Sequence, residues 1–474
     1  MNWKLIRLVL AFVAPVSIGI SIPLDTLASP EPFPIYTCIQ PNVAFWKKIY
    51  TEYESSQGII HDKVNPNIVY GEVELVDANE CGARKINRSR VKKAKNKYKG
   101  ILAKLARGKF PTTVREWEVA DLFGSEASLT TFRKAMRNIR CQAGQKDRFR
   151  EGIIRSGAYL DQMKKIFSSH GLPVDLVYLP HVESSFNPKA YSKFGAAGIW
   201  QFTRSTGRRF LTIDYTVDER RDPIRSTQAA ALLLKSHYEK LQSWPMAITA
   251  YNHGITGMLR AKRLKGNYER VFQEYKGRRF KFASRNFYAE FLAATDVAKQ
   301  CQIYFGNLKQ HFAPKTQEVI LPGYASLKEL AEHLNTEMDV LRDFNPSLRE
   351  PVYLGQKYVP KDYALRVPVD LVSSLPQDMF KPDQKASQFY KVQRGDTASM
   401  IAAAHGISLR DLIIANDLNV RATIYAGEIL RLPLPPTESD SLVKLESSKM
   451  TEAVGTITST DAEIIRAYER GERY

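Results

Sequence analysis

A single glutamate, Glu183, interrupts the otherwise apolar stretch LPHVESSFNP. A carboxyl group in partly apolar surroundings resists ionisation, so its pKa rises and it can donate a proton near neutral pH. The competing interpretation is a solvent-facing glutamate on a helix, which is the usual place for this residue type. The stretch therefore predicts a candidate general acid that has no obvious second carboxylate beside it.

Two later stretches supply polar groups that such an acid would need around a substrate. The segment GAAGIWQF, residues 195–202, has two glycines three residues apart, which permit close approach of a ligand or of backbone. Gln201 can donate and accept hydrogen bonds, and an aromatic residue could form a wall for a sugar ring, although core packing is favoured for Trp200. The segment AYN adds the phenol of Tyr251 and the amide of Asn252. Paired amides and hydroxyls suit N-acetyl sugars.

A helical body must position these groups. From about residue 147 to residue 299 the sequence reads as nearly continuous helices with almost no strand signal. Pro245 and Gly254 predict the start and the end of one helix. Apolar residues at three-to-four spacing predict the buried face of another helix. These residues are Ala230, Leu233, Leu234, Tyr238 and Leu241.

The helix that carries Glu183 should be irregular. Pro173 fits its first turn, Pro188 should end it, and Pro180 inside it removes a backbone hydrogen bond. We therefore expect a kink just before Glu183, which would place the carboxyl group near a helix end.

Length and charge limit the kinds of protein that the chain can be. At 474 residues it is too long for one ordinary core and predicts about two or three domains. With 44% hydrophobic and 11% aromatic residues it is globular rather than disordered. A formal net charge of +19 favours an anionic polymer as partner, which includes nucleic acid, a membrane surface and an acidic cell-wall glycan.

Residues 1–28 have the layout of a secretory signal peptide. Lys4 and Arg7 precede an apolar run over residues 8–22, and small polar residues follow it. An uncleaved membrane anchor is the alternative, but the run is short for a membrane span and Pro15 interrupts it. We expect an exported protein.

The four cysteines, Cys38, Cys81, Cys141 and Cys301, are far apart and form no CxxC pair. In an oxidising compartment one or two disulfides and buried free thiols both fit this pattern. The first cysteine is too far from the apolar run for lipid attachment. The residues HVE at 181–183 begin like a zinc deaminase motif, but no PCxxC follows, so neither a metal nor a cofactor is expected.

Residues 38–140 are expected to form a mostly helical N-terminal region with a basic segment. Residues 84–109 hold twelve lysines and arginines and no acidic residue, and Leu102, Leu105 and Ala106 give them an apolar stripe. This pattern predicts an amphipathic helix. Its basic face is either simply solvated or docks on an anionic surface; nucleic acid is not expected, because an exported protein rarely meets it.

The C-terminal part contains a repeat. Residues 388–433 read as a short strand, two helices and a closing strand, and residues 318–368 follow the same plan more loosely. In this alignment DFNPS, around Asn345, matches IANDL, around Asn416. Two copies of one βααβ unit explain this self-similarity. Residues 434–474 read as a polar tail.

In their order and spacing, VESSFNPKAYSKFGAAGIWQF, TAYNHG and ASRNFYAEFLAA resemble the soluble lytic transglycosylase domain, especially its D-type membrane-bound branch. Residues 388–433 resemble a LysM module, and residues 318–368 resemble a degenerate second copy. The resemblance covers about residues 140–300 and 388–433 well and residues 45–140 more weakly. It implies a mainly α chain, with a lysozyme-like helical catalytic domain followed by small α+β modules of LysM type.

The resemblance implies cleavage, without water, of the bond between N-acetylmuramic acid and N-acetylglucosamine in periplasmic peptidoglycan, whose glycan strands are the expected partner. Glu183 would act first as general acid and then as general base, because the C6 hydroxyl of the muramic residue is the nucleophile. The remaining expected contacts to substrate are Ser184, which would orient Glu183, and Gly198, Gln201, Tyr251, Asn252 and Tyr288. The family commonly has a tyrosine where this chain has Phe287, so Tyr288 is carried over with a shift of one residue.

In LysM modules two loops bind N-acetylglucosamine. Gly395, Asp396, Thr397 and Asn416 would lie in those loops. Asp396 and Thr397 are explained equally well as helix caps.

Two other functions compete. A hydrolytic muramidase would need a second carboxylate, and the nearest acidic stretch offers Asp214, Asp218, Glu219 and Asp222. These acids alternate with arginines, so salt bridges explain them better. A glycan-binding scaffold without activity is the other alternative.

Overall fold

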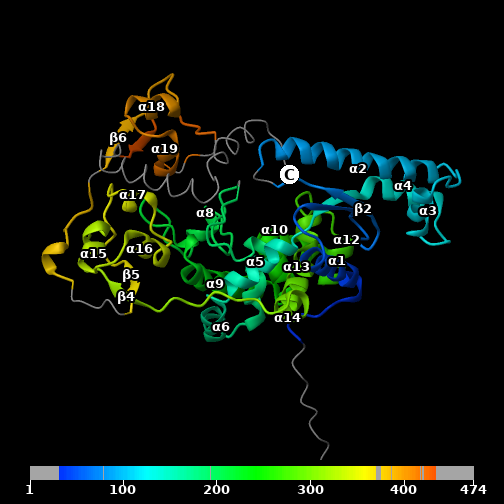
Figure 1. Cartoon of the computed structure of the whole chain (residues 1–474), viewed down its shortest axis with the longest axis horizontal. Coiled ribbons are helices and arrows are strands. Elements are labelled where there is room, and N and C mark those ends of the chain that lie inside the picture. The colour runs from blue at the N-terminus through cyan, green and yellow to red at the C-terminus, as the bar shows by residue number, and fades with distance from the viewer. Residues whose placement is uncertain are drawn as a thin grey trace, which may run out of the picture.

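The computed structural model describes residues 31–77, 80–192, 194–369, 375–385, 387–416, 418 and 421–433. The predicted signal peptide and the predicted polar tail lie outside these residues. The described chain is mainly helical, with three small antiparallel sheets. Figure 1 shows an N-terminal arm at one end, helices in the middle and two small α+β units at the other end.

The central body is helical throughout and contains the largest hydrophobic core. Its elements are α5 (Lys146–Ser156), α6 (Leu160–Ser169), the 3₁₀ helix η2 (Val174–Tyr178), α7 (Leu179–Ser184), α8 (Arg204–Gly207), η3 (Glu219–Arg221), α9 (Pro223–Leu241), α10 (Trp244–His253), α11 (Ile255–Lys265), α12 (Tyr268–Glu274), α13 (Phe282–Lys299) and α14 (Cys301–Phe305).

The two helices predicted most specifically are confirmed. On α9 the predicted apolar face is buried, except that Tyr238 is half-buried and stacks on Trp244 with ring centroids 4.3 Å apart. On α10 Pro245 lies in the first turn, and Gly254 ends the helix with a φ of 87°. Proline costs nothing at the start of a helix, because its missing N–H has no partner there.

The region predicted as residues 38–140 is divided between two cores. The 3₁₀ helix η1 (Thr37–Ile39) and α1 (Gln40–Thr51) belong to the core of the central body. There the Asn42 amide donates a hydrogen bond of 2.6 Å to Oδ1 of Asn286 on α13, and both side chains are buried. Helix α1 therefore forms part of the scaffold behind the candidate site.

The rest of this region forms the arm seen in Figure 1. Its antiparallel sheet has the order β2 (Val69–Glu74), β1 (Gln57–Asp62), β3 (Ile139–Ala143). The helices are α2 (Ala83–Leu105), α3 (Val114–Asp121) and α4 (Leu129–Asn138). The basic segment is helical as predicted, because α2 includes most of it and its apolar stripe is buried in the core of the arm.

Two similar α+β units follow the central body. The first contains β4 (Thr316–Ile320), α15 (Leu327–His333), α16 (Met338–Phe344), α17 (Glu350–Tyr353) and β5 (Ala364–Pro368). The second contains β6 (Gln388–Lys391), α18 (Ala398–Ala404), α19 (Leu409–Asn416) and β7 (Ile429–Leu432), and the 3₁₀ helix η4 (Gln377–Met379) lies between the units. The first and last strands pair antiparallel in each unit. The first unit differs by the extra helix α17.

One asparagine in each unit makes the same three hydrogen bonds. The Asn345 amide donates to the carbonyls of Leu341 (2.9 Å) and Arg366 (2.8 Å), and its oxygen accepts from Arg366 N (2.9 Å). The Asn416 amide donates to the carbonyls of Leu412 (2.9 Å) and Arg431 (2.8 Å), and its oxygen accepts from Arg431 N (2.6 Å). The matching bonds support the repeat and show that Asn416 ties its second helix to its last strand.

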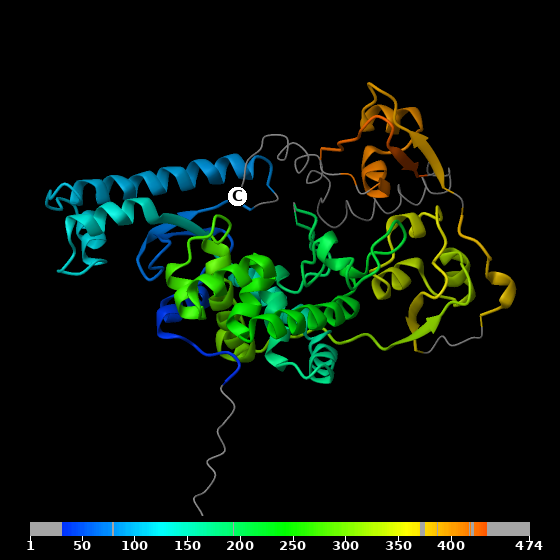
Figure 2. The same ribbon diagram turned by 180° about the vertical axis from the view of Figure 1, so that it is seen from behind.

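The first unit is docked on the acidic loop of the central body. The backbone N–H of Asp218 donates to the Ser347 carbonyl at 2.7 Å, and that of Arg349 donates to the Thr216 carbonyl at 2.9 Å. Arg366 forms a salt bridge of 2.5 Å with Asp222. Figure 2 shows the first unit directly beside the helices of the central body.

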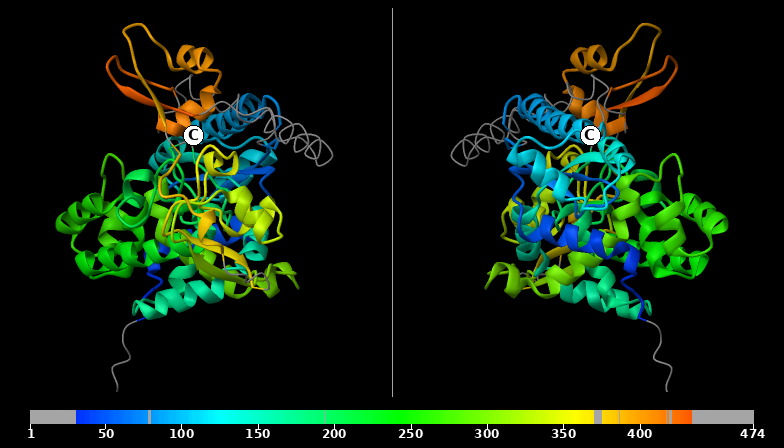
Figure 3. Two further views of the ribbon diagram at one scale, coloured as in Figure 1. Left: turned by 90° about the vertical axis from the view of Figure 1, so that its left-hand side faces the viewer. Right: turned by 90° about the vertical axis from the view of Figure 1, so that its right-hand side faces the viewer.

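The second unit and the arm lie on the same side of the central body in Figures 1 and 3. No helix in the described part of the chain has by itself the length and apolar character of a membrane span; α18 and α19 meet that standard only together, across a bend of 113°.

All four cysteines are free thiols in this structure. The cysteine spacing fitted both disulfides and free thiols, and the structure has the thiols.

Candidate active site

Glu183 lies one residue before the end of the short helix α7. Pro180 is in the first turn of α7 and does not kink a longer helix; the preceding turn is the separate 3₁₀ helix η2. The expected kink is therefore a break between two helices at Leu179. Pro180 starts the second helix because its fixed φ suits a first turn, where no hydrogen bond is lost.

The chain after Glu183 is held in a strained turn. Ser185 and Phe186 have φ values of 50° and 54°, which side-chain-bearing residues rarely adopt. The guanidinium of Arg155 donates two hydrogen bonds, of 3.1 and 2.8 Å, to the Ser185 carbonyl. At Gly152 an added Cβ would lie 3.1 Å from that carbonyl oxygen, so α5 packs closely against the turn. Such strain persists where the surroundings fix it, often at functional sites.

The environment of Glu183 suits a proton donor. Its side chain is half-buried, and burial raises its pKa to about 8. It lines a cavity of about 390 Å³ together with Gln145, Arg148, Arg155, Val182, Ser184, Ser185 and Asn187. At neutral pH most of this carboxyl group is protonated, as the isolated glutamate in an apolar stretch predicted.

Ser184 does not hold Glu183 directly. Its hydroxyl donates a hydrogen bond of 2.8 Å to the Ile199 carbonyl, which fixes the end of α7 against residues 195–202. The phenol of Tyr251 donates to the next carbonyl, that of Trp200, at 2.8 Å. Burial and the nearby Glu183 raise the Tyr251 pKa well above its usual value. Glu183, Ser184 and Tyr251 are thus gathered around one backbone segment.

The glycine and the amide of this segment have structural partners. Gly198 has a φ of 75°, and a Cβ there would lie 1.8 Å from the Arg220 carbonyl oxygen. Glycine is therefore required at this position because the backbone of Arg220 lies against it. The amide nitrogen of Gln201 donates to the Gly198 carbonyl at 2.9 Å, and Gln201 itself has a φ of 47°. Its amide oxygen is the group that can accept a hydrogen bond from a substrate.

The aromatic residues of the segment belong to the core. Trp200 is fully buried and its indole nitrogen donates to Thr227 Oγ1 at 2.8 Å, which confirms the core interpretation for this residue. Phe202 is also buried and forms no sugar platform. On α10 the exposed Asn252 accepts a hydrogen bond of 2.8 Å from the Ser284 hydroxyl, so α13 orients its amide.

The expectation for Tyr288 is wrong. This side chain is fully buried, and its hydroxyl donates a hydrogen bond of 3.0 Å to the Pro34 carbonyl. Its ring packs edge-on against Tyr268, with centroids 5.2 Å apart. Phe287 is buried as well. Neither position presents a hydroxyl to a substrate, because both side chains complete the core around α13.

A second carboxyl group, which sequence reasoning missed, lies on α13. Glu290 is half-buried, and burial together with the charge of Glu183 raises its pKa to about 8. Arg140 of the arm moderates this shift. The sequence already indicated this residue, because Glu290 is an isolated acid in the mostly apolar stretch NFYAEFLAA, as Glu183 is in LPHVESSFNP.

The acidic loop considered for a second catalytic carboxylate is structural. Asp218 is buried and forms a two-pronged salt bridge with Arg220, with both contacts at 2.8 Å. Asp222 pairs with Arg366, and Asp214 accepts three hydrogen bonds from Thr216 and Val217. The fourth acid, Glu219, accepts a hydrogen bond from the Thr212 backbone. The expected salt bridges are confirmed for Asp218 and Asp222, whereas Asp214 and Glu219 accept backbone and hydroxyl hydrogen bonds instead.

The predicted glycan contacts of the second α+β unit also have structural partners. Asp396 accepts hydrogen bonds from the Tyr390 hydroxyl and the Gln393 backbone, and Thr397 caps α18 by accepting from Met400 N. The Asn416 side chain makes three hydrogen bonds within the unit, so it serves the fold, and its expected contact with glycan stays a prediction. Gly395 has a φ of 100° with open space beside it, so its backbone remains accessible.

Comparison with known families defines the two parts of the chain. Residues 165–271 match the Transglycosylase SLT domain and residues 390–433 match the LysM domain. The chain therefore contains a transglycosylase SLT domain, which includes Glu183 and Tyr251, followed by a LysM domain.

Individual relatives are consistent with these domains. The chain is 29% identical to "Membrane-bound lytic murein transglycosylase D" of Escherichia coli K12 over 277 residues, which are 55% of this chain and 60% of the relative. The protein of the same name from Escherichia coli O6:H1 gives the same values. "Membrane-bound lytic murein transglycosylase F" of Serratia proteamaculans is 26% identical over 185 residues, 36% of this chain and 35% of the relative. The chain thus spans about 60% of the length of the first of these relatives.

Proposed function

We propose that the chain is a peptidoglycan lytic transglycosylase. It cleaves the β-1,4 bond between N-acetylmuramic acid and N-acetylglucosamine and leaves a 1,6-anhydro-N-acetylmuramic acid end. The observation that carries the proposal is the half-buried carboxyl group of Glu183, whose pKa burial raises to about 8, at a cavity where the SLT domain meets helix α5. The names of the relatives support the same activity.

Glu183 acts twice in this reaction. As an acid it gives its proton to the glycosidic oxygen while the bond to the anomeric carbon breaks. As a carboxylate it then accepts the proton of the muramic C6 hydroxyl, whose oxygen bonds to the anomeric carbon. The substrate supplies the nucleophile, so no second carboxylate is needed, unlike in ordinary glycosidases. General acid and base assistance contributes about 100- to 10,000-fold to such rates.

Fixed neighbours make this double use effective. Ser184 and Tyr251 hold the 199–200 backbone beside Glu183, and Arg155 holds the turn after it. The Gln201 oxygen and the exposed Asn252 amide are the groups that we assign to the N-acetyl substituents. A carboxyl group held in this way transfers its proton without first reorganising its surroundings.

A hydrolytic muramidase is the second candidate, because Glu290 offers a second carboxyl group. A hydrolase uses its second carboxylate in the ionised form, as a base or a nucleophile. Burial and the proximity of Glu183 raise the Glu290 pKa to about 8, so most of this group is protonated at neutral pH. Little of it is therefore ionised and available as a base or nucleophile there, which favours the lytic reaction.

Digestion of purified sacculi tests the proposal. The wild type should release muropeptides with anhydro ends, one water lighter than hydrolytic products, and Glu183→Gln should release none above background. Asp147→Asn, at a half-buried carboxylate that accepts two hydrogen bonds from Ser55 and does not line the Glu183 cavity, is the matched control and should keep the product type. Hydrolytic products from the wild type, or unchanged release by Glu183→Gln, would refute it.

The LysM domain is proposed to bind N-acetylglucosamine in glycan strands, and the first α+β unit is proposed to be a degenerate copy of it. The matching bonds of Asn345 and Asn416 support the second statement. Because the predicted side-chain contacts are largely used within the fold, recognition should rely on backbone groups such as those of Gly395. Binding of chitin oligomers by the full chain, followed by NMR at Gly395, tests this assignment.

The proposed location is the periplasm, reached through a cleaved signal peptide over residues 1–28. The relatives are named as membrane-bound, which is consistent with the cell envelope. The basic face of α2 is proposed to contact an anionic surface there. Sequencing of the mature N-terminus from the periplasmic fraction tests export and cleavage, and co-sedimentation with anionic vesicles tests the surface contact.

A further inference from the structure

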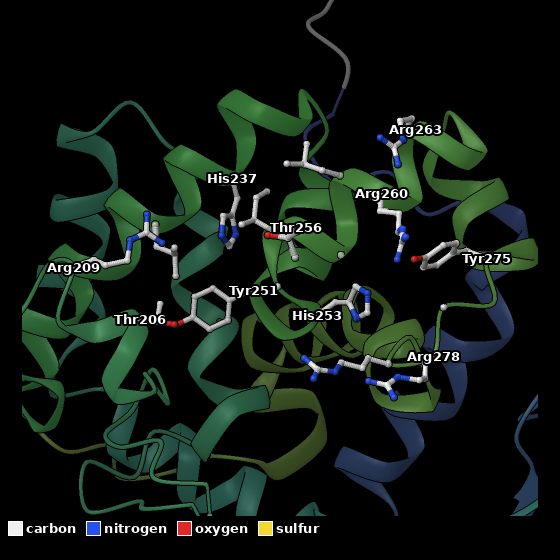
Figure 4. A pocket seen from close by; sticks show the side chains of 18 residues that line it. Thr206, Arg209, His237, Tyr251, His253, Thr256, Arg260, Arg263, Tyr275 and Arg278 are labelled. Atoms are coloured by element: carbon white, nitrogen blue, oxygen red, sulfur yellow. The ribbon is translucent and has the colours of Figure 1, made fainter. Parts of the chain in front are cut away.

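A cavity of about 950 Å³ opens beside the SLT active site. It lies between the chain after α8, helix α11 and the loop that joins α12 to α13. Figure 4 shows Arg209 and Tyr251 on one side of His253, and Arg260, Arg263 and Tyr275 on the other. Five arginines line this cavity, which is called the arginine pocket below. They are Arg209, Arg260, Arg263, Arg278 and Arg279.

The arginine pocket has no charge partner of its own. No aspartate or glutamate is among the residues that line it, and within the described residues none of its arginines forms a salt bridge. All five arginine side chains are exposed. Burial and Arg279 lower the pKa of His253, so this ring adds no charge at neutral pH. A cleft lined by positive charges concentrates anions.

Tyr251 links this cavity to the surroundings of Glu183. The ring of this residue lines the cavity, while its hydroxyl is bonded to the Trp200 carbonyl beside Glu183. A ligand group in the cavity would therefore be close to a sugar whose bond is being cleaved.

Two glycines keep the cavity wall in place. At Gly257 an added Cβ would lie 2.5 Å from Nε2 of His253, and at Gly277 it would lie 2.7 Å from the Tyr275 ring. Any side chain at either position would displace a wall residue. The open shape is thus built into the local sequence.

We infer that the arginine pocket binds carboxylate groups of the peptide stem attached to the muramic acid at the cleavage site. This inference rests on the proposed function. In stem-bearing peptidoglycan the sugars are uncharged and the lactyl group is held in an amide, so the free carboxylates are on the stem. Guanidinium groups match carboxylates with two parallel hydrogen bonds. The cavity volume is in the range that accommodates a short peptide.

Binding to three kinds of glycan strand tests the inference. The strands are stem-bearing, stem-bearing with the carboxylates converted to amides, and amidase-treated, which lack the stem and expose the lactyl carboxylate. Affinity is measured with full-length Glu183→Gln, which should not turn over, alone and combined with Arg260→Gln/Arg263→Gln or Arg278→Gln/Arg279→Gln. Arg133→Gln/Arg137→Gln on α4 is the control with the same loss of charge.

We expect each pocket pair to weaken binding of stem-bearing strands about 10-fold or more, because charge-assisted hydrogen bonds are lost. Binding of the amidated strands should not change, and the control should match Glu183→Gln. An equal loss of affinity for stem-bearing and amidated strands, or no loss of affinity for either, overturns the inference. So does a loss on amidase-treated strands as large as that on stem-bearing strands, because the lactyl group would then be the ligand.

A parallel digestion separates this inference from the proposed function. The digestion uses chains that keep Glu183. If the wild type forms no anhydro products, the proposed function fails, while the binding comparison still decides the role of the pocket. If it forms them and the pocket pairs lower kcat/KM equally on stem-bearing and amidated strands, only the inference fails. Melting temperatures of all variants show whether each has folded.

Discussion

Glu183 on α7 and Glu290 on α13 are two half-buried carboxyl groups, and the charge of the first raises the pKa of the second. Burial alone raises the pKa of Glu183 and is the largest cause for Glu290, and each pKa is about 8. Two such groups resist simultaneous ionisation. At neutral pH the site therefore contains mostly protonated carboxyl groups, which is the state that a general acid requires.

Glu290→Gln should separate the lytic from the hydrolytic reaction. If Glu183 works alone, this variant keeps its anhydro products and loses less than about 10-fold in kcat, because the amide preserves the shape of the side chain. Mass spectrometry of the muropeptides and initial rates give both quantities. Loss of activity comparable to that of Glu183→Gln would instead assign Glu290 a catalytic role.

The activity should depend on pH through the raised pKa of Glu183. The acid form is nearly complete below pH 7 and is lost as pH rises through about 8, so kcat/KM should fall with a midpoint there. An ordinary glutamate would place that midpoint near its usual value of about 4.3. A pH–rate profile from pH 5 to pH 10 distinguishes the two, and an alkaline limb absent near pH 8 would contradict the assignment.

The same shifts predict the pH dependence of stability. A carboxyl group with a pKa raised by folding binds its proton more tightly in the folded chain, so its contribution is fully present below about pH 4.5 and is lost as pH rises through 8. Glu290→Gln removes the part of this loss of stability that is due to Glu290. At pH 8.5 it should raise the free energy of unfolding by about 1 to 3 kcal/mol relative to wild type.

Denaturant unfolding at the two pH values measures this effect. The difference between Glu290→Gln and wild type should shrink toward zero at pH 4.5. A stabilisation that does not vary with pH would show that the amide acts through packing instead of through the charge.

Gly198→Ala should be far more damaging than Gly195→Ala. Both glycines have positive φ values, of 75° and 76°. At Gly195 the nearest atom to an added Cβ is the Tyr191 hydroxyl at 3.6 Å, so only the backbone strain of about 1 to 2 kcal/mol remains. At Gly198 the Cβ would overlap the Arg220 carbonyl oxygen, and we expect a loss of about 3 kcal/mol or more. Urea unfolding of the two variants checks the order, which similar losses would contradict.

Asn345→Ala and Asn416→Ala should destabilise their own α+β units to a similar extent. Each change removes three hydrogen bonds, including both bonds to the backbone of the last strand, which costs about 1 to 3 kcal/mol. Hydrogen exchange of the full-length chain, followed unit by unit, measures this cost. A fully stable Asn416→Ala unit with lost glycan binding would restore Asn416 to the binding site and refute its structural role.

Local patterns in the sequence predicted much of the helical scaffold and singled out the candidate acid Glu183. Helix α10 could be bounded because Pro245 and Gly254 act through their own backbone conformations. Glu183 could be singled out because an isolated charge among apolar residues needs a reason. By the same criterion Glu290 could have been found, but its segment was used only to look for a tyrosine.

Features that depend on which way a helix faces, or on distant partners, were not predictable in this way. Tyr288 was placed by matching a family motif, which fixes a position in the chain and not the direction of its side chain. Its actual partner, the Pro34 carbonyl, lies 254 residues earlier. Likewise Asp222 was expected to pair with a neighbouring arginine, and its partner Arg366 lies 144 residues later. No short-range pattern encodes such contacts.

The docking of the first α+β unit affects how this chain can be divided for experiments. Arg366 of that unit pairs with Asp222, whose other carboxylate oxygen accepts the first N–H groups of α9. Cutting the chain before residue 316 would strand this acid without its counter-charge and leave the Asp218 N–H without Ser347. The central body and the first unit should therefore be kept together, because a fragment that ends before residue 316 would lose part of the support for the start of α9.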